Sequence, residues 1–120
     1  MIGKQTKGTS FSGCVCYVLR EDKSKLLEPV GVEGTPEQMA EQFELQTLLN
    51  DKVKNTVGHT SLNFSPEDGE RLKTDDKLML KIAHDYMAKM GTENTQYIVV
   101  RHTDREHSHC HIVFNRVDND

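Results

Sequence analysis

Hydrophobic and polar residues alternate along residues 57–64 and 109–117, and this spacing predicts two β-strands. A mainly apolar run at residues 97–101 predicts a third strand. The short polar segment between residues 101 and 109 has a length that suits a hairpin loop. We therefore expect the last two strands to lie side by side and antiparallel.

Two segments carry apolar residues at helical spacing, residues 35–55 and residues 75–90. The first begins with Thr35 as a helix N-cap, Pro36 in the first helical position and Gln38 placed to close a capping box. In the second, a single stripe along the helix holds the apolar residues Leu78, Ile82, Tyr86 and Met90.

The N-terminal third of the chain gives weaker patterns. Residues 1–10 are polar and predict no element. Residues 11–22 predict a short helix, with a strand as the alternative because Val, Cys and Tyr interleave there. Residues 25–33 suit a loop or a short edge strand, and residues 65–69 form a stop signal after the strand before them.

These elements predict an α+β fold, an antiparallel β-sheet with helices packed on one face. Met39 and Phe43 from the first long helix, and Leu78 and Ile82 from the second, are expected to cover the apolar side of the sheet. The opposite side would then carry polar side chains. A chain of 120 residues with 35% hydrophobic and 28% charged residues suits one compact domain with a polar surface.

The composition also limits the location of the protein. No apolar run reaches the length of a membrane span and the N-terminus has no signal-peptide core, so we expect no membrane partner. The cysteines are an odd, sparse set, Cys14, Cys16 and Cys110, which favours the reducing cytoplasm over a disulfide framework.

The net charge of −4 gives no general case for binding nucleic acid, but the charge is unevenly distributed. Residues 1–25 hold five basic and two acidic residues, and such a segment could meet a phosphate backbone. An ordinary solvated surface explains the imbalance equally well. The candidate phosphate contacts are Lys4, Lys7, Arg20 and Arg101.

Four of the six histidines fall within residues 102–111. On a strand, His109 and His111 would share one face about 7 Å apart, while Cys110 would turn to the other face. A third imidazole from the neighbouring strand, at His102, would complete a site for a divalent metal with open positions. Such an ion could act as a Lewis acid on a phosphoryl oxygen.

Residues 102–115 resemble the signature motif of the mobilization relaxases, which belong to the His-hydrophobe-His single-strand endonucleases. Cys110 occupies the position of the hydrophobe. Residues 13–20 resemble the family motif that carries a nucleophilic tyrosine, and residues 58–66 resemble its middle motif. The resemblance implies a relaxase-like core and one relaxase domain over residues 1–120, truncated at its C-terminus.

The resemblance also implies a reaction. Tyr17 would attack a DNA phosphodiester at a transfer-origin nick site and form a 5′-phosphotyrosyl intermediate. His102, His109 and His111 would hold the metal, with Mg²⁺ or Mn²⁺ as the usual ion, although imidazoles also accept other transition metals. His59 could contact the phosphate or assist Tyr17, or be a simple strand histidine. The implied partners are single-stranded or supercoiled origin DNA and accessory mobilization proteins.

Two further residues of the histidine segment have open roles. Asp104 could orient a ligand histidine by accepting a hydrogen bond from the ring nitrogen that does not bind the metal, or it could cap the hairpin turn. His107 could replace His102 as the third metal ligand, and only the spacing of the family motif favours His102.

Two other functions fit part of the same sequence. Residues 107–113 also resemble the histidine-triad nucleotide hydrolases, but Ser108 is polar where that family has an apolar residue, and Tyr17 has no role there. A non-catalytic DNA-binding or metal-stabilised module is the second alternative.

Overall fold

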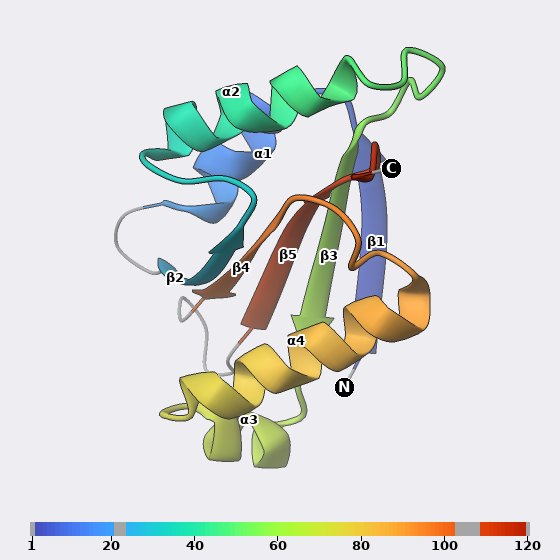
Figure 1. The fold of residues 1–120 in the computed structure, drawn as a ribbon. Helices are drawn as coiled ribbons and strands as arrows, with labels where there is room; N and C mark the ends of the chain where they lie inside the picture. The colour runs from blue at the N-terminus through green and yellow to red at the C-terminus, as the bar shows by residue number, and fades with distance from the viewer. Residues whose placement is uncertain (1, 21–23, 103–108, 120) are drawn as a thin grey trace.

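The computed structural model describes residues 2–20, 24–102 and 109–119. Over these ranges the chain forms a five-stranded sheet and four helices (Figure 1). In chain order the elements are β1 (Ile2–Gly8), α1 (Phe11–Val18), β2 (Ser24–Val30), α2 (Pro36–Thr47), β3 (Val57–Asn63), α3 (Pro66–Leu72), α4 (Asp76–Met90), β4 (Tyr97–His102) and β5 (His109–Asn115). Within the same ranges, no helix combines the length and apolar character that a membrane span requires.

The strands follow the order β1-β3-β5-β4-β2, and every neighbouring pair is antiparallel. The strands predicted from alternation, β3 and β5, and the strand predicted from an apolar run, β4, are confirmed and form the centre of the sheet. The possible edge strand becomes β2, with an irregular register between Leu26 and Glu28. Strand β1 was not predicted, because its polar side chains lie on an exposed edge and leave no apolar pattern.

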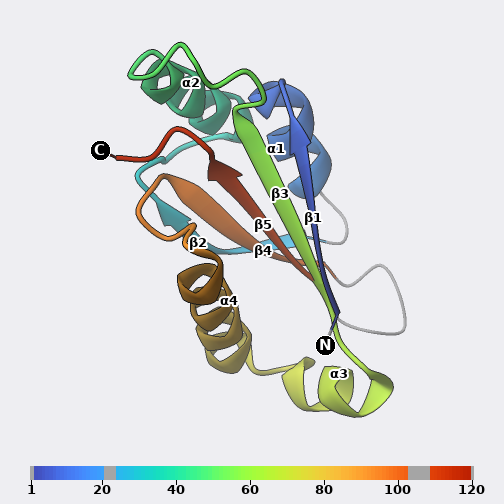
Figure 2. The same ribbon diagram turned by 90° about the vertical axis from the view of Figure 1, so that its right-hand side faces the viewer.

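The predicted α+β class and antiparallel sheet are confirmed, but the helices cover both faces of the sheet instead of one (Figure 2). Helices α1 and α2 pack on the face that carries Ile98, Val100 and Val113. Helices α3 and α4 pack on the face that carries Val99 and Ile112. Because β4 is buried along its whole length, both sides of this strand need a cover.

Helix α2 begins as predicted and ends earlier than predicted. Thr35 Oγ1 accepts a hydrogen bond from the Gln38 amide at 3.1 Å, and Gln38 Oε1 accepts one from the Thr35 amide at 2.8 Å, which completes the capping box. The helix stops at Thr47 and not near residue 55. The side chain of Asn50 accepts a hydrogen bond from the Lys52 amide at 3.1 Å, and this local turn competes with further helix.

The long helix α4 is confirmed, and it ends at Gly91, which adopts a left-handed conformation with φ 70°. The core-facing stripe, however, was predicted one residue out of phase. The residues fully buried against the sheet are Met79, Ala83 and Met87, whereas Met90 is 48% exposed. Flexible methionine side chains fill this core, so the branched residues that dominate the sequence pattern lie at its margin.

Two local details complete the sheet. The predicted stop at residues 65–69 is the start of helix α3, where the Ser65 hydroxyl accepts a hydrogen bond from the Asp68 amide at 3.2 Å. On β3, Gly58 lies opposite Phe114 of β5, and a Cβ atom at Gly58 would overlap the Phe114 ring. This glycine therefore allows the aromatic ring to lie flat against the neighbouring strand.

Candidate active site

Four histidines lie on one face of the sheet, at the end that α1 and α2 leave open. The register places His102 opposite His109 on β4 and β5, and His111 lies two residues along β5 on the same face. His59 joins them from β3. They line a cavity of about 420 Å³. Its complete lining is Lys4, Thr6, Tyr17, Arg20, His59, Ser61, Asn63, His102, His109 and His111.

His111 is the centre of this cluster. Its ring centroid lies 4.0 Å from that of His102, 5.1 Å from that of His59 and 6.4 Å from that of His109. The Nδ1 atom of His111 is 2.8 Å from Nε2 of His59, a hydrogen-bond distance between two imidazoles. The strand pairing therefore adds a fourth histidine to the three that the C-terminal motif supplies.

In two of the rings, one nitrogen atom donates a hydrogen bond to an oxygen atom of the protein. His102 donates a hydrogen bond from Nε2 to the carbonyl oxygen of Val18 at 2.6 Å, and His109 donates one from Nδ1 to Oδ1 of Asn63 at 2.6 Å. A neutral imidazole has one N–H group, so the lone pair remains on Nδ1 of His102 and on Nε2 of His109. Histidines that bind metals are commonly oriented by such a hydrogen bond on the other nitrogen.

Burial and the neighbouring His102 lower the pKa of His59 below its ordinary value of 6.5. His59 is therefore a neutral imidazole at pH 7, able to accept a proton or share one with His111. Cys110, between the paired histidines, has the opposite orientation. Its thiol is buried in the core on the far side of the sheet, and burial raises its pKa to about 12, so it offers no thiolate to the cavity.

Within the described ranges, no three His, Cys, Asp or Glu side chains already converge as a metal site. The chemistry of the donors nevertheless fits a divalent ion, because imidazole nitrogens from two adjacent strands line one cavity and two of them are held by oxygen acceptors. The residues that could hold an ion are His102, His109 and His111.

Tyr17 lies in the last turn of α1 and lines the same cavity as the histidines. Its side chain is 52% exposed, so a large substrate can reach the phenol. The guanidinium carbon of Arg20 lies 4.8 Å from the centroid of the Tyr17 ring, which is a cation–π distance. The candidate nucleophile, a basic side chain and the histidines therefore face one space.

A family profile described as "Relaxase: MobA/VirD2-like, nuclease domain" matches residues 17–120. The chain belongs to the MobA/VirD2-like relaxase family. No match is found among curated proteins. The matched residues include Tyr17 and all four histidines of the cavity, so the site lies within the relaxase nuclease domain and a role on DNA follows. The family, and not the histidine-triad hydrolases, accounts for the histidine motif.

Of the predicted phosphate contacts of this relaxase, some line the cavity and others lie elsewhere. Lys4 and Arg20 line the cavity from β1 and from the residues after α1. Lys7 pairs with Gly58 in the register, on the face of β1 that points away from the histidines. The predicted residues Asp104 and His107 lie outside the described residues.

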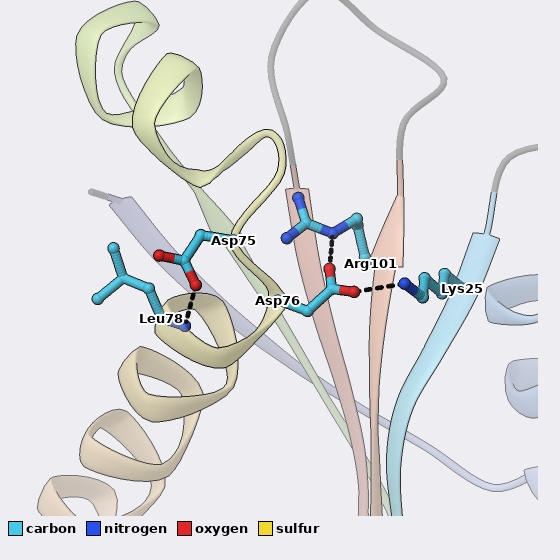
Figure 3. A network of polar contacts seen from close by, with 5 residues as sticks. All are labelled: Lys25, Asp75, Asp76, Leu78 and Arg101. Carbon is cyan, nitrogen blue, oxygen red and sulfur yellow. Dashed lines mark hydrogen bonds and ion pairs between the residues drawn. The ribbon is translucent and has the colours of Figure 1, made fainter.

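Arg101 has a structural position that argues against a phosphate contact at the cavity. Its side chain is 4% exposed and its Nε donates to Oδ1 of Asp76 at 2.8 Å (Figure 3). Arg101 pairs with Cys110 in the register, so this contact lies on the face opposite the histidines. Lys25 donates to the other carboxylate oxygen. The hydrogen bonds from Lys25 and Arg101 hold the pKa of Asp76 below its usual value. The network ties the start of α4 to β4 and β2.

Three polar residues line the relaxase cavity although no role in the site was predicted for them: Thr6, Ser61 and Asn63. Ser61 and Asn63 share the alternating face of β3 with His59, which is a signal in the sequence. Their partners are not visible in the sequence, because the contact between Asn63 and His109 depends on the register of β3 against β5. Thr6 lies on a strand that alternation did not reveal.

Proposed function

We propose that this relaxase nicks one DNA strand at the transfer origin of a plasmid or other mobile element, by transesterification onto Tyr17. The observation that supports the proposal best is that Tyr17, exposed on α1, lines one cavity with His59, His102, His109 and His111. The proposed substrate is single-stranded or supercoiled origin DNA, with accessory mobilization proteins as further partners. The sparse set of free cysteines supports a cytoplasmic setting.

In the proposed reaction the phenol oxygen of Tyr17 attacks the scissile phosphorus atom. A 5′-phosphotyrosyl bond forms as the bond to the 3′-oxygen breaks, and the 3′-oxygen takes up a proton to leave as a hydroxyl. A phenol is a weak nucleophile until it loses its proton, so a base is required. His59 is the candidate, because its lowered pKa keeps it unprotonated in the same cavity. The covalent link conserves the bond energy for rejoining the strand.

His102, His109 and His111 would hold the divalent ion, with Mg²⁺ or Mn²⁺ expected and other transition metals compatible with three imidazoles. When bound, such an ion supplies positive charge that polarises the scissile phosphate. The chain itself orients two of these rings, through the Val18 carbonyl and the Asn63 side chain. Three protein ligands leave coordination positions for the phosphate oxygens.

Lys4 and Arg20 are the proposed phosphate contacts at the cavity. They approach from different segments, β1 and the chain after α1, so a DNA backbone between them would pass over the histidines. Thr6 adds a hydroxyl that can donate to phosphate from the same strand as Lys4. These groups can position a strand but do not read its sequence.

The test uses a supercoiled plasmid that carries the cognate origin, incubated with the protein and Mn²⁺ or Mg²⁺, then denatured and treated with protease. The wild-type protein should yield relaxed DNA with protein attached to the 5′ end, and a chelator should prevent it. Tyr17→Phe should yield no nick and no adduct while still binding origin DNA. Tyr86→Phe is the matched control, because this tyrosine packs against Gly3 of β1 on the other face. Nicking retained by Tyr17→Phe would reject the nucleophile.

A further inference from the structure

The end of helix α2 and the turn that follows it carry apolar side chains that are exposed to solvent. Met39 and Phe43 face the sheet and are fully buried in the core with α1. Leu45 in the last turn of α2, in contrast, is 67% exposed, and Leu48 and Leu49, which follow the helix, are 78% and 66% exposed. Leucines gathered on one exposed helix side are a common feature of surfaces that bind another protein.

Leu45 and Leu48 border a shallow groove of about 640 Å³ between α2 and the first turn of α1. Its exposed apolar part is formed by Leu45 and Leu48, three residues apart, and the core residue Ala40 lies at its base with 4% of its surface exposed. Its acidic part is formed by Glu37, Glu41 and Glu44. Ser12 of α1 completes the lining, and this lining, which lies entirely in described parts of the chain, contains no Lys or Arg.

Two of the acidic side chains are held in place at the junction with α1. Glu44 Oε1 accepts a hydrogen bond from the Phe11 amide at 3.5 Å, and Glu37 Oε1 lies 4.0 Å from the Cys16 thiol that donates to it. Glu37 and Glu44 therefore each have a polar contact with α1, and with Glu41 they line the same groove as Leu45 and Leu48. The negative charge of these glutamates repels the phosphates of DNA and attracts a cationic partner.

The charge also argues against a second copy of this chain as the occupant. A two-fold symmetric contact brings the same patch of both copies together, so Glu37, Glu41 and Glu44 would face their own counterparts. Like charges placed across an interface are unfavourable. A helix with leucine-like side chains on one face and Lys or Arg beside them matches both parts of the groove.

We propose that the groove between α1 and α2 binds a cationic amphipathic helix of a partner protein. Apolar side chains of that helix would lie on Leu45 and Leu48, and its basic side chains would pair with Glu37 and Glu41. The groove shares no lining residue with the histidine cavity, whose charged lining is basic. The relaxase can therefore hold DNA and this partner at the same time.

The probe is a synthetic peptide of about 18 residues, or five helical turns, with Leu at core spacing and Lys elsewhere. A peptide of the same composition in scrambled order is the control. Binding to the full chain is measured by fluorescence anisotropy. The patterned peptide should bind at least about tenfold more tightly than the scrambled one, which corresponds to about 1.4 kcal/mol.

Two double variants test the two parts of the groove. Leu45→Ser with Leu48→Ser should weaken binding of the patterned peptide about tenfold or more, because both apolar contacts are lost. Glu37→Gln with Glu41→Gln should weaken it several-fold at low salt, and the difference should disappear at high salt. Met90→Ser is the matched control, since this exposed apolar residue lies on α4, away from the groove.

Three results would overturn the proposal. Equal binding of the patterned and scrambled peptides would show general attraction to an acidic protein. Unchanged binding by the leucine double variant would place the contact elsewhere. Self-association of the wild-type chain in sedimentation, abolished by the leucine double variant, would assign the groove to a second copy. Nicking by the leucine double variant should equal that of the wild type, which separates this test from that of the active site.

Discussion

The imidazole of His102 and the carbonyl group of Val18 are joined by a hydrogen bond of 2.6 Å. This contact links the end of β4 to the last residue of α1, directly after Tyr17. A candidate metal ligand therefore also fixes the helix that carries the candidate nucleophile. This buried contact, together with the packing of Phe11, Val15 and Val18 in the core, helps to fix the position of Tyr17 relative to the histidines.

Removal of the His102 ring should loosen α1 even when no metal is present. We expect His102→Ala to lower the free energy of unfolding by about 1–2 kcal/mol through the lost hydrogen bond and the space left behind. Amide hydrogen exchange, measured with chelator, should increase in α1. His109→Ala is the control, because the hydrogen bond from its ring goes to Asn63 of β3. Equal exchange in the two variants would contradict the link.

Asn63 should act on metal affinity through His109, since it fixes the ring by its contact with Nδ1. Loss of an orienting partner of this kind typically lowers metal affinity about 10- to 100-fold. We expect Asn63→Leu to show this loss in a calorimetric titration with Mn²⁺, and Asn63→Asp to restore the affinity by keeping an oxygen acceptor. If the leucine variant binds Mn²⁺ as the wild type does, the orienting role is wrong.

The lowered pKa of His59 predicts a loss of stability on acidification. The unfolded chain takes up a proton near pH 6.5, whereas folded His59 does so only at lower pH. The unfolded state therefore binds more protons in this window, and the free energy of unfolding falls as the pH drops below 6.5. His59→Gln should reduce the fall in melting temperature that the wild type shows over about two and a half pH units, from pH 7.5 to pH 5.

The control for this pH effect is Thr6→Ala, which alters the same cavity without changing a titratable group. It should keep the pH dependence of the wild type. A pH profile of His59→Gln that coincides with that of the wild type would show that other groups cause the acid sensitivity.

Even the smallest side chain at position 58 should lower the stability of the protein. Because a Cβ atom there overlaps the Phe114 ring, Gly58→Ala should destabilise the chain by about 1–3 kcal/mol, the usual cost of forcing extra volume into a packed site. Combining it with Phe114→Leu should recover part of the loss. Gly8→Ala is the control, since its Cβ would lie 3.9 Å from Val57 in ordinary contact. Equal melting temperatures of the two alanine variants would exclude the clash.

Much of the sheet follows from local pattern. Alternation and apolar runs predicted β3, β4 and β5, and the capping signals at Thr35 and Gln38 placed the start of α2. The prediction that Arg101 contacts phosphate at the cavity did not take the alternation of side chains along a strand into account. A residue next to His102 on a strand points to the other face, where Arg101 meets Asp76.

Other features depend on contacts between distant segments and have no local signature. The pairing of β3 with β5 brings His59 to His111 and Asn63 to His109, and nothing in either strand alone specifies this register. The burial of both faces of β4 requires helices on both sides of the sheet. A run of apolar residues is consistent with such a strand but does not show which helix lies on which side.

The position of β1 has a practical consequence for shortening this protein. The matched region begins at residue 17, yet β1 lies before it, pairs along the whole of β3 and lends Lys4 and Thr6 to the cavity. A version trimmed to the matched region would lose one wall of the cavity. It would also turn β3 into an edge strand, whose backbone amides and carbonyls that now pair with β1 would be open to solvent, and an unprotected edge of this kind invites aggregation.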